Sequence, residues 1–176
     1  MFNDLAKKRR SIRKYKDQPV EHNKINTILE SALRAPSGGG SRPWEFIVVT
    51  DKPLLEKLSV AREGGSAFVK GAAVGVVICG DPQKTGTLIE DCSIAAVFIQ
   101  LAACSMGLGS RWWHMRDKMH DNNTTSRDYL AKLLDLPDGL FVECIIAIGY
   151  PDEDVAPYKK EDLPINKIHY NRYGQK

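Results

Sequence analysis

The segment from Asp91 to Met106, DCSIAAVFIQLAACSM, constrains the fold more than any other part of this 176-residue chain. It has the length of a helix and is apolar nearly all round, so we expect it at the centre of the fold or at a subunit interface. Asp91 is its candidate N-cap, and the glycines that follow Met106 are expected to end it. The apolar stretch that starts at Ile94 is shorter than the roughly 18 residues of a membrane span and contains Gln100, so no membrane segment is expected.

Three short apolar runs rich in β-branched residues predict buried strands, at residues 44–51, 72–81 and 142–151. Helical patterns lie around them, at residues 21–35, 53–60 and 126–134, the last with Thr125 as a candidate N-cap. In the first helix the apolar residues recur at helical spacing and are expected to share one buried face, which comprises Ile25, Ile28, Leu29, Ala32 and Leu33. These elements predict one α+β domain over residues 1–176, a small sheet covered by helices.

The end of the chain, from about residue 152 to residue 176, carries little core of its own. A tail of this kind either packs on another subunit or stays disordered, and the sequence leaves both open.

Basic charge is concentrated near the N-terminus. The chain holds 25 Lys and Arg against 22 Asp and Glu, and residues 7–16, KKRRSIRKYK, contain seven of the basic residues and no acidic one. In an extended segment Arg9, Ser11 and Arg13 would project to one side, and guanidinium groups beside a hydroxyl suit a phosphate. A solvated basic face is the alternative. No nucleic-acid partner is expected, because the block has only Tyr15 as an aromatic and no recognition motif.

The four cysteines form no CxxC pair and lie in apolar runs, at Cys79, Cys92, Cys104 and Cys144. They are expected to be buried, reduced thiols of a cytoplasmic protein. Residues 1–16 lack the apolar region of a signal peptide, which agrees with that location.

Side-chain chemistry is sparse. The histidines and cysteines have no metal-ligand spacing, so no metal is expected, and there is no GxSxG nucleophile motif. The glycine patterns of dinucleotide and P-loop sites are missing as well. If the chain is an enzyme, its reactive group is expected to come from a cofactor.

Several separated segments together resemble one family, the nitroreductase-like flavoproteins, which are FMN-dependent NAD(P)H oxidoreductases. The matching segments occur in the family's order and span residues 9 to about 153: RRSIRKY, APSGGGSRPWEFIVV, DCSIAAVFIQLAACSMGLGSRWW and IIAIGYPDE. The resemblance implies a mostly antiparallel sheet covered by helices, and a homodimer with FMN at the interface. The tail would then pack on the partner subunit.

The resemblance implies FMN contacts for the N-terminal motif. Arg9 matches the phosphate partner, and Arg10 contributes mainly through its backbone. Ser11 and Arg13 match residues near the pyrimidine edge of the flavin. Hydride addition at N5 leaves negative charge at N1 and O2, which a fixed guanidinium at Arg13 would stabilise.

The glycine loop is implied to reach the flavin of the other subunit. It runs from Pro36 to Arg42 and includes Ser37, Gly38 and Gly40. Glycines remove side chains and permit positive φ, which lets the backbone approach a planar ring closely. Relatives often have Asn at the position of Gly40 and Gln at that of Arg42, so this loop is where the chain is expected to differ from them.

Trp112, Trp113 and His114 match a segment that lies along the opposite side of the flavin. Core or interface packing is an equal alternative for the two tryptophans, and His114 is either a proton donor or structural. A phosphate-clamping pair of basic residues near the end of the family's chain is matched by Lys159 and Lys160.

The resemblance implies an enzyme that passes a hydride from NAD(P)H through flavin N5 to a small-molecule acceptor, such as a nitroaromatic or a quinone, in two half-reactions. The alternatives are a specialised flavoprotein of the same fold, either a reductive dehalogenase or a flavin-consuming enzyme, and a non-catalytic flavin-binding module. Residues 82–90 are short where longer relatives carry helical cover, so the site would be more open or covered by another segment.

Overall fold

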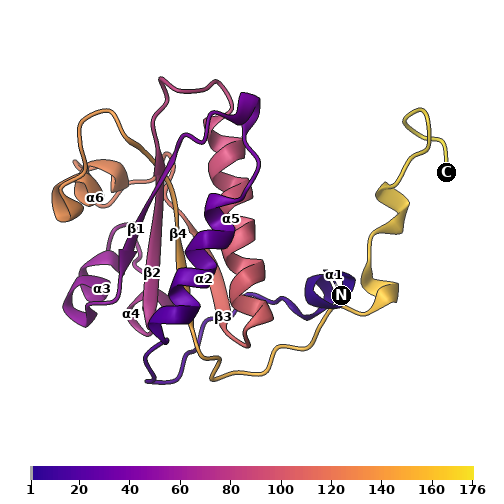
Figure 1. Cartoon of the computed structure of the whole chain (residues 1–176), viewed down its shortest axis with the longest axis horizontal. Coiled ribbons are helices and arrows are strands. Elements are labelled where there is room, and N and C mark those ends of the chain that lie inside the picture. The colour runs from indigo at the N-terminus through magenta and orange to yellow at the C-terminus, as the bar shows by residue number, and fades with distance from the viewer. Residues whose placement is uncertain (1) are drawn as a thin grey trace.

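The computed structural model describes residues 2–176 and contains one four-stranded sheet between two layers of helices (Figure 1). The strands are β1 (Trp44–Val49), β2 (Val74–Gly80), β3 (Gly109–His114) and β4 (Phe141–Gly149). They lie in the order β1-β2-β4-β3, and every neighbouring pair is antiparallel. The predicted α+β class with an antiparallel sheet is therefore confirmed.

Helices cover both faces of the sheet. Helices α2 (His22–Leu33) and α5 (Leu88–Ser105) pack on one face, and α3 (Lys52–Leu58), α4 (Ala67–Lys70) and α6 (Ser126–Leu134) on the other. The central strands β2 and β4 are buried on both faces along nearly their whole length. This double cover explains why both strands have continuous apolar sequences rather than alternating ones.

Helix α5 is the central helix, and it is longer than the apolar segment from which it was predicted. It starts at Leu88, so Asp91 lies inside its first turn and is not the N-cap. Asp91 is 2% exposed, and its carboxylate accepts hydrogen bonds from another part of the chain, described below. By length and composition α5 could cross a membrane, but half of it is buried against the sheet and α2.

One stripe of α5 stays uncovered. Ile89, Ile94 and Val97 are 38%, 37% and 47% exposed, respectively. Leu33 of α2, which was expected on a buried face, is also 57% exposed. The prediction for Leu33 is wrong because α2 contacts α5 through a narrower stripe, centred on Ile28 and Ala32.

Strand β3 was not predicted from the sequence. Its residues, GSRWWH, mix polar and aromatic side chains, so they lack the apolar run that marks the other strands. Gly109 was interpreted as the end of the preceding helix, but it is the first residue of this strand. Helix α1 (Phe2–Lys8) was also missed, since none of its residues is buried.

Residues 9–15 run extended past the end of the sheet. The Ile12 N–H donates to the Ser110 carbonyl at 3.1 Å, and the Tyr15 hydroxyl donates to the carbonyls of Ile12 and Ala147. Two glycines let the segment pass this closely. A Cβ at Gly109 would lie 2.7 Å from Ile12 Cγ1, and one at Gly149 would lie 2.9 Å from the Tyr15 ring.

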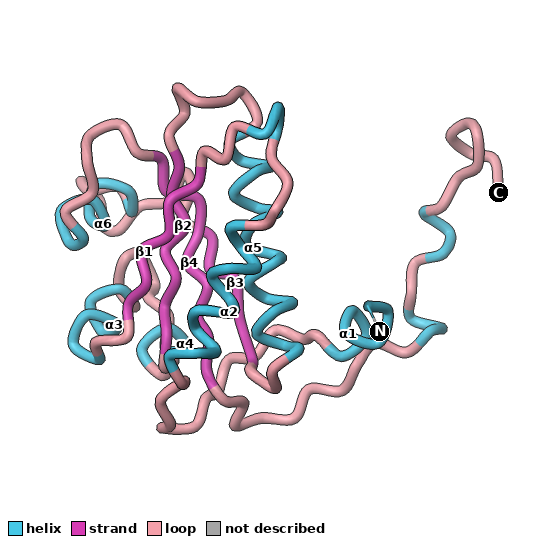
Figure 2. Tube along the Cα trace, in the orientation of Figure 1, coloured by secondary structure: helices cyan, strands magenta, loops and turns pink. Residues whose placement is uncertain are grey.

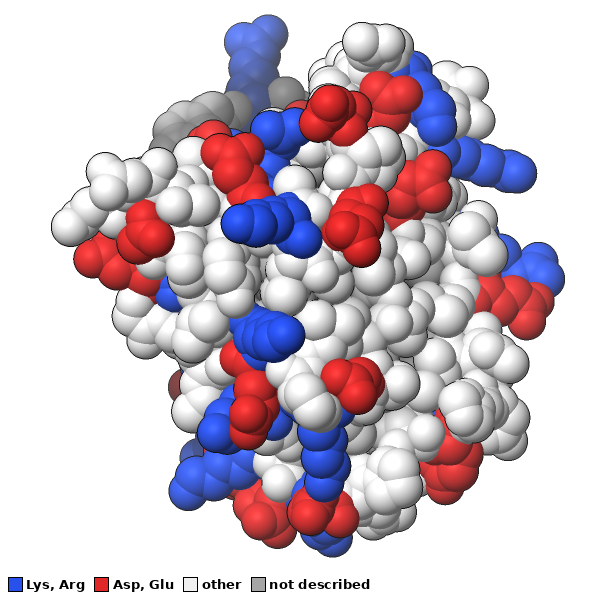
Figure 3. Space-filling model, turned by 90° about the vertical axis from the view of Figure 1, so that its left-hand side faces the viewer, with Lys and Arg blue, Asp and Glu red and all other residues white. Residues whose placement is uncertain are grey.

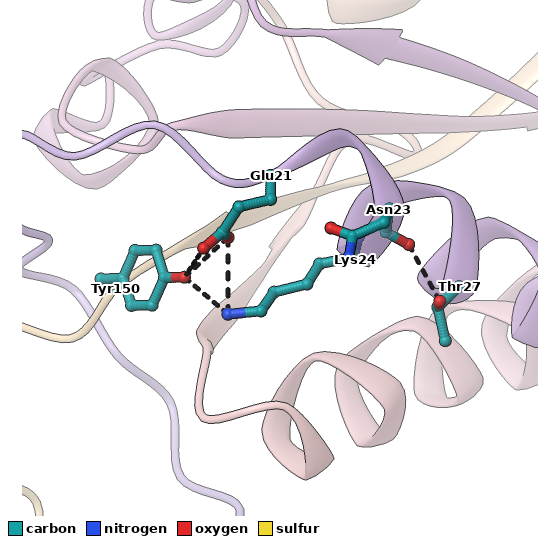
Figure 4. A network of polar contacts seen from close by, with 5 residues as sticks. All are labelled: Glu21, Asn23, Lys24, Thr27 and Tyr150. Atoms are coloured by element: carbon teal, nitrogen blue, oxygen red, sulfur yellow. Dashed lines mark hydrogen bonds and ion pairs between the residues drawn. The ribbon is translucent and has the colours of Figure 1, made fainter.

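A polar network fixes the start of α2 to the end of β4 (Figure 4). The Tyr150 hydroxyl donates to the Glu21 carboxylate at 2.7 Å, and Lys24 Nζ donates to the Tyr150 oxygen at 2.6 Å. The Tyr150 hydrogen bond lowers the pKa of Glu21 and raises that of Lys24. The network fixes the position of residue 150, from which the C-terminal tail departs.

The C-terminal tail extends away from the body of the molecule (Figure 2). Its ordered pieces are two single turns of 3-10 helix, η2 (Lys160–Asp162) and η3 (Ile165–Lys167). Large apolar and aromatic side chains along it are between 46% and 93% exposed, at Tyr158, Leu163, Ile165, Ile168, Tyr170 and Tyr173. The tail therefore leaves a substantial apolar surface unburied in this chain.

Acidic and basic side chains alternate over the face that carries α3, α4 and α6 (Figure 3). Several of them pair there, such as Lys52 with Asp17 at 2.6 Å and Lys70 with Glu56 at 3.0 Å. On this face the positive charges are therefore largely balanced by neighbouring carboxylates.

The cysteines are free thiols, and three of them are buried as expected. Burial raises the pKa of Cys79 and of Cys92 to about 12. Cys104 is only half-buried, so the expectation of full burial is wrong for this residue.

We expect Gly109→Ala to destabilise the fold by about 1–3 kcal/mol, because the new methyl group must displace Ile12 and the extended segment that it anchors. Urea denaturation measures the change. Gly86→Ala is the matched control, since a Cβ at Gly86 meets nothing within 4 Å. Equal stability of the two variants would show that residues 9–15 do not need this close approach.

Candidate functional site

A hollow of about 520 Å³ lies beside the N-terminal motif. Its lining combines polar groups from the motif with apolar groups from α5 and β3, and includes Arg9, Ser11, Val97, Gln100, Leu101 and Trp112. The hollow therefore offers an apolar floor with a guanidinium and a hydroxyl at its margin. Concave sites of this composition suit small organic ligands that carry an anionic group.

The open edge of β3 borders this hollow. The Met115 N–H donates to the Glu143 carbonyl of the neighbouring chain segment. In an antiparallel pair, every second residue directs its backbone N–H and C=O groups toward the partner strand. The residues between these, Ser110, Trp112 and His114, therefore direct their backbone groups away from β4. The outward carbonyl of Ser110 accepts a hydrogen bond from the Ile12 N–H. Within residues 2–176, the outward N–H groups of Trp112 and His114 have no acceptor. They form a short edge of free backbone donors, which a planar ligand with acceptor atoms could satisfy.

Arg13 lies at the same corner. Its guanidinium reaches back to the Ser11 carbonyl at 3.5 Å, and no carboxylate among the described residues pairs with it. The Arg13 and Lys14 backbone amides instead donate to the Glu153 carboxylate, which holds the segment in its extended form. The Arg9 guanidinium therefore remains available at the margin of the hollow, whereas Arg13 lies outside the lining and close to the Glu153 carboxylate.

The glycine loop is built around a single turn of 3-10 helix, η1 (Gly38–Gly40). Gly39 and Gly40 have φ values of 57° and 70°, which confirms the expected positive φ for this run. Gly38 has a different reason to be glycine, because a Cβ there would overlap the Thr87 hydroxyl. Arg42 also has positive φ, 46°, and its N–H donates to Ser37 Oγ at 2.9 Å.

Asp91 ties this loop to α5. The Gly38 N–H donates to Asp91 Oδ1 at 2.8 Å, and the Thr87 hydroxyl donates to Oδ2 at 3.0 Å. Sequence reasoning missed this residue as a site component, because an acid near a helix start was interpreted as its cap. The carboxylate instead fixes the position of the loop on the first turn of α5.

The loop and the N-terminal motif lie at opposite ends of α5 (Figure 1). The loop is bonded at Asp91, whereas Arg9 lies beside Cys104. At 1.5 Å per residue these points are about 20 Å apart along the helix axis. The chain thus brings Arg9, Ser11, Arg13 and Trp112 together, and separately gathers Pro36, Ser37, Gly38, Gly40 and Arg42.

The two tryptophans have different surroundings. Trp112 lines the hollow, whereas Trp113 is 7% exposed and packs edge-on against Phe68, with 6.0 Å between ring centroids. Alternate residues of a strand face opposite sides of the sheet, which accounts for this division.

His114 lies near a buried carboxylate rather than in the hollow. Its Nδ1 is 3.8 Å from Oε1 of Glu143, a residue that is 2% exposed and pairs with Arg116 Nε at 3.2 Å. Burial raises the pKa of Glu143, which Arg116 opposes. Burial and the neighbouring Arg116 lower the pKa of His114.

The tail begins next to the N-terminal motif. The Arg10 guanidinium lies 4.1 Å from the Tyr158 ring centroid and donates to the Ala156 carbonyl. Lys159 and Lys160 follow Tyr158 directly and are exposed. The Arg10 side chain is therefore occupied by the tail, consistent with a contribution to the site through its backbone alone.

Comparison with known proteins identifies the class. The model of the nitroreductase family matches residues 6–61 and 55–150. A solved FMN-dependent nitroreductase from Clostridium difficile R20291 is 48% identical, with a TM-score of 0.94 over 96% of this chain and 98% of that chain.

Two curated relatives extend the match. A protein of Archaeoglobus fulgidus named "Putative NADH dehydrogenase/NAD(P)H nitroreductase" is 34% identical over 94% of both chains. The FMN reductase [NAD(P)H] of Bacillus subtilis is 27% identical over 92% of this chain and 69% of its own. The chain belongs to the nitroreductase family, which confirms the resemblance drawn from its motifs.

We expect Asp91→Ala to loosen the glycine loop and to cost about 1–3 kcal/mol of stability, because it leaves the Gly38 N–H without an acceptor. Hydrogen exchange at Gly38–Arg42 should speed up, while exchange in the central strands β2 and β4 changes only by the global destabilisation. Asp91→Asn is the matched control, since its amide oxygen can still accept from Gly38. Unchanged exchange at the loop in Asp91→Ala would contradict the anchoring role.

Proposed function

We propose that the chain is an NAD(P)H-dependent oxidoreductase that holds FMN at the open edge of β3. The observation that carries this proposal is the combination of an apolar hollow, unpaired backbone donors at Trp112 and His114, and the Arg9 guanidinium at the margin of the hollow, with Arg13 close to Ser11. A planar heteroaromatic ring with a phosphate tail fits this set, because the ring supplies acceptors and apolar area while the phosphate supplies negative charge.

The residues of the chain bind and orient FMN in this proposal. Arg9 pairs with the phosphate, and Ser11 and Arg13 face the pyrimidine edge. Trp112 and the β3 edge support the ring, with the outward amides as hydrogen-bond donors. Trp113 does not contact FMN in this proposal, because its side chain is buried and packs against Phe68.

Bound FMN supplies the hydride-transfer chemistry between NAD(P)H and the acceptor. The chain contributes positioning and a fixed positive potential, which stabilise negative charge at the place where it develops. No side-chain nucleophile is required. His114 has its pKa lowered by burial, so its imidazole is neutral at physiological pH and serves to shape the end of β3.

The complete site takes its second half from another copy of the chain. The glycine loop is too far from Arg9 within one chain to edge the same ring, and the uncovered stripe of α5 lies between the two halves. A two-fold axis across this stripe would place the loop of each copy at the N-terminal motif of the other. The exposed tail then packs on the partner, which would bring Lys159 and Lys160 to a phosphate.

The acceptor in this proposal is a small molecule such as a nitroaromatic or a quinone, and the protein acts in the cytoplasm. Residues 81–87 form a hydrogen-bonded turn without a helix, in keeping with an accessible site. A reductive dehalogenase, a flavin-consuming enzyme and a non-catalytic flavin-binding module remain the alternatives.

The purified protein is expected to bind one FMN per chain, to show flavin absorbance, and to bleach anaerobically with NADH or NADPH. Arg9→Ala should weaken FMN binding about ten- to a hundredfold, through the loss of a charge-assisted hydrogen bond to phosphate. Lys132→Gln, on the exposed side of α6, controls for the change in net charge.

Each of the other outcomes would decide against a specific part of the proposal or identify one of the alternatives. Absence of FMN binding would refute the proposed cofactor site. Binding without reduction by either nucleotide would leave the flavin-binding module, and unchanged FMN affinity in Arg9→Ala would remove Arg9 from the phosphate contact. Release of halide, or consumption of the flavin itself, would identify the specialised enzymes.

A further inference from the structure

Arg62 lies at the far end of the free β3 edge, and sequence reasoning did not select it. Its Nη1 donates to the outward carbonyl of His114 at 3.4 Å. At the other end of the edge, the Ser110 carbonyl accepts from the Ile12 N–H. Four residues separate Ser110 from His114, so the edge between these two contacts is about 13 Å long. In the proposed site Arg62 therefore borders the ring at the end opposite the N-terminal motif.

A tight turn fixes the backbone at Arg62. The Gly65 N–H donates to the Arg62 carbonyl at 2.9 Å, and the Glu63 N–H donates to the Met119 carbonyl at 2.7 Å. Gly64 and Gly65 have φ values of 79° and 60°, which glycine adopts without strain. The turn thus holds Arg62 in place before any ligand arrives.

The Arg62 guanidinium keeps most of its donors free. Within residues 2–176 no carboxylate forms an ion pair with it, and its hydrogen bond to His114 is long. A guanidinium carries five N–H donors, so several can serve a ligand. Burial lowers the pKa of His114, as do three neighbouring cations, Arg116, Lys118 and Arg62. Positive groups therefore gather at this end of β3, where they would attract an anionic group.

An open groove of about 410 Å³ lies against Arg62. The two glycines of the turn and His120 line it as well. The His120 ring stacks on Tyr129 with 3.9 Å between centroids, and its Nδ1 lies 2.7 Å from the Val60 carbonyl. These contacts fix one wall of the groove, so a ligand that enters it meets Arg62 in a defined position.

Two acidic residues, Glu63 and Asp121, also line the groove. Asp121 Oδ1 accepts the N–H groups of Asn123 and Thr124, each at 2.8 Å, so this carboxylate is held within its own turn. Glu63 is exposed to solvent. An anion in the groove would be attracted by Arg62 and repelled by Glu63, and removal of either charge should therefore change its affinity in opposite directions.

We infer that Arg62 is a specificity-determining residue, which pairs with an anionic substituent, such as a carboxylate, on the aromatic acceptor. This inference rests on the proposed function. Because Arg62 contacts β3 directly, its charge lies close to the proposed ring position. A substituent carried by the acceptor itself reaches that position more readily than the phosphates of the nucleotide, which are separated from the nicotinamide by a ribose.

The test compares benzoate with benzamide, which are similar in shape, differ in charge and are not reduced. Their dissociation constants are measured on the oxidised, FMN-loaded protein from the change in flavin absorbance. Arg62→Gln should weaken benzoate about tenfold, the size of one charge-assisted hydrogen bond, and leave benzamide unchanged. Arg62→Lys should retain most of the benzoate affinity. Glu63→Gln should strengthen benzoate about two- to fivefold, and Lys132→Gln should change neither constant.

Turnover should show the same selectivity. Arg62→Gln should raise the KM for para-nitrobenzoate with little change in kcat, because the lost contact is made equally in the ground state and the transition state. The constants for para-nitrobenzamide and for NADPH should stay as in the wild-type protein, and so should the affinity for FMN.

Several results would overturn the role of Arg62. Equal weakening of benzoate and benzamide would mark a packing role, and weaker FMN binding would make Arg62 a cofactor contact. A selective rise in the KM for NADPH, with benzoate unchanged, would place the anionic group on the reductant. Weaker benzoate binding in Glu63→Gln would also contradict the inference, and this variant provides the test if Arg62→Gln does not fold. Failure of the wild-type protein to bind FMN is a separate result that removes the proposed function itself.

Discussion

The hydrogen bond from the Gly38 N–H to the buried Asp91 carboxylate fixes the glycine loop to helix α5. The position of this loop relative to the rest of the proposed site depends on that contact. Helix α5 is sealed to the sheet and to α2, so it cannot tilt or shift without opening the core. Its first turn carries the glycine loop, and its last turns lie beside Arg9. The separation of the two halves is therefore set by the geometry of the helix. In the proposed dimer, the second copy would cover the exposed stripe of α5 between them.

The second constraint is the close passage of the N-terminal motif across the end of the sheet. Gly109 and Gly149 make room for Ile12 and Tyr15, which turn the segment so that its guanidinium groups meet the free edge of β3. An edge strand with unpaired donors is normally a liability. Here the edge is short and is flanked by positive charge, which makes it suitable for a planar anionic ligand.

The sequence predicted the elements whose patterns are set by burial alone, including α5, the two central strands and the positive φ of Gly39 and Gly40. It could not predict β3, because Ser110, Arg111 and His114 interrupt the apolar pattern of this strand at the edge of the sheet. The sequence also could not tell which of Trp112 and Trp113 lines the hollow and which packs in the core, because adjacent strand residues differ only in the face of the sheet that they occupy. The role of Asp91 depends on its contact with a distant residue, Gly38, that no local pattern encodes.

The central claim is that each FMN site is shared by two chains, and co-expression of two differently tagged variants tests it most directly. Arg9→Ala disables the N-terminal motif, and Gly38→Val displaces the glycine loop by its clash with Thr87. In each homodimer, both sites carry one of the two substitutions. In a heterodimer with shared sites, one site carries both substitutions and the other site carries neither. The account predicts homodimers depleted of FMN and a doubly purified heterodimer that binds one FMN per dimer with wild-type affinity. A heterodimer as depleted as the homodimers would show that each site lies within a single chain and would contradict the account.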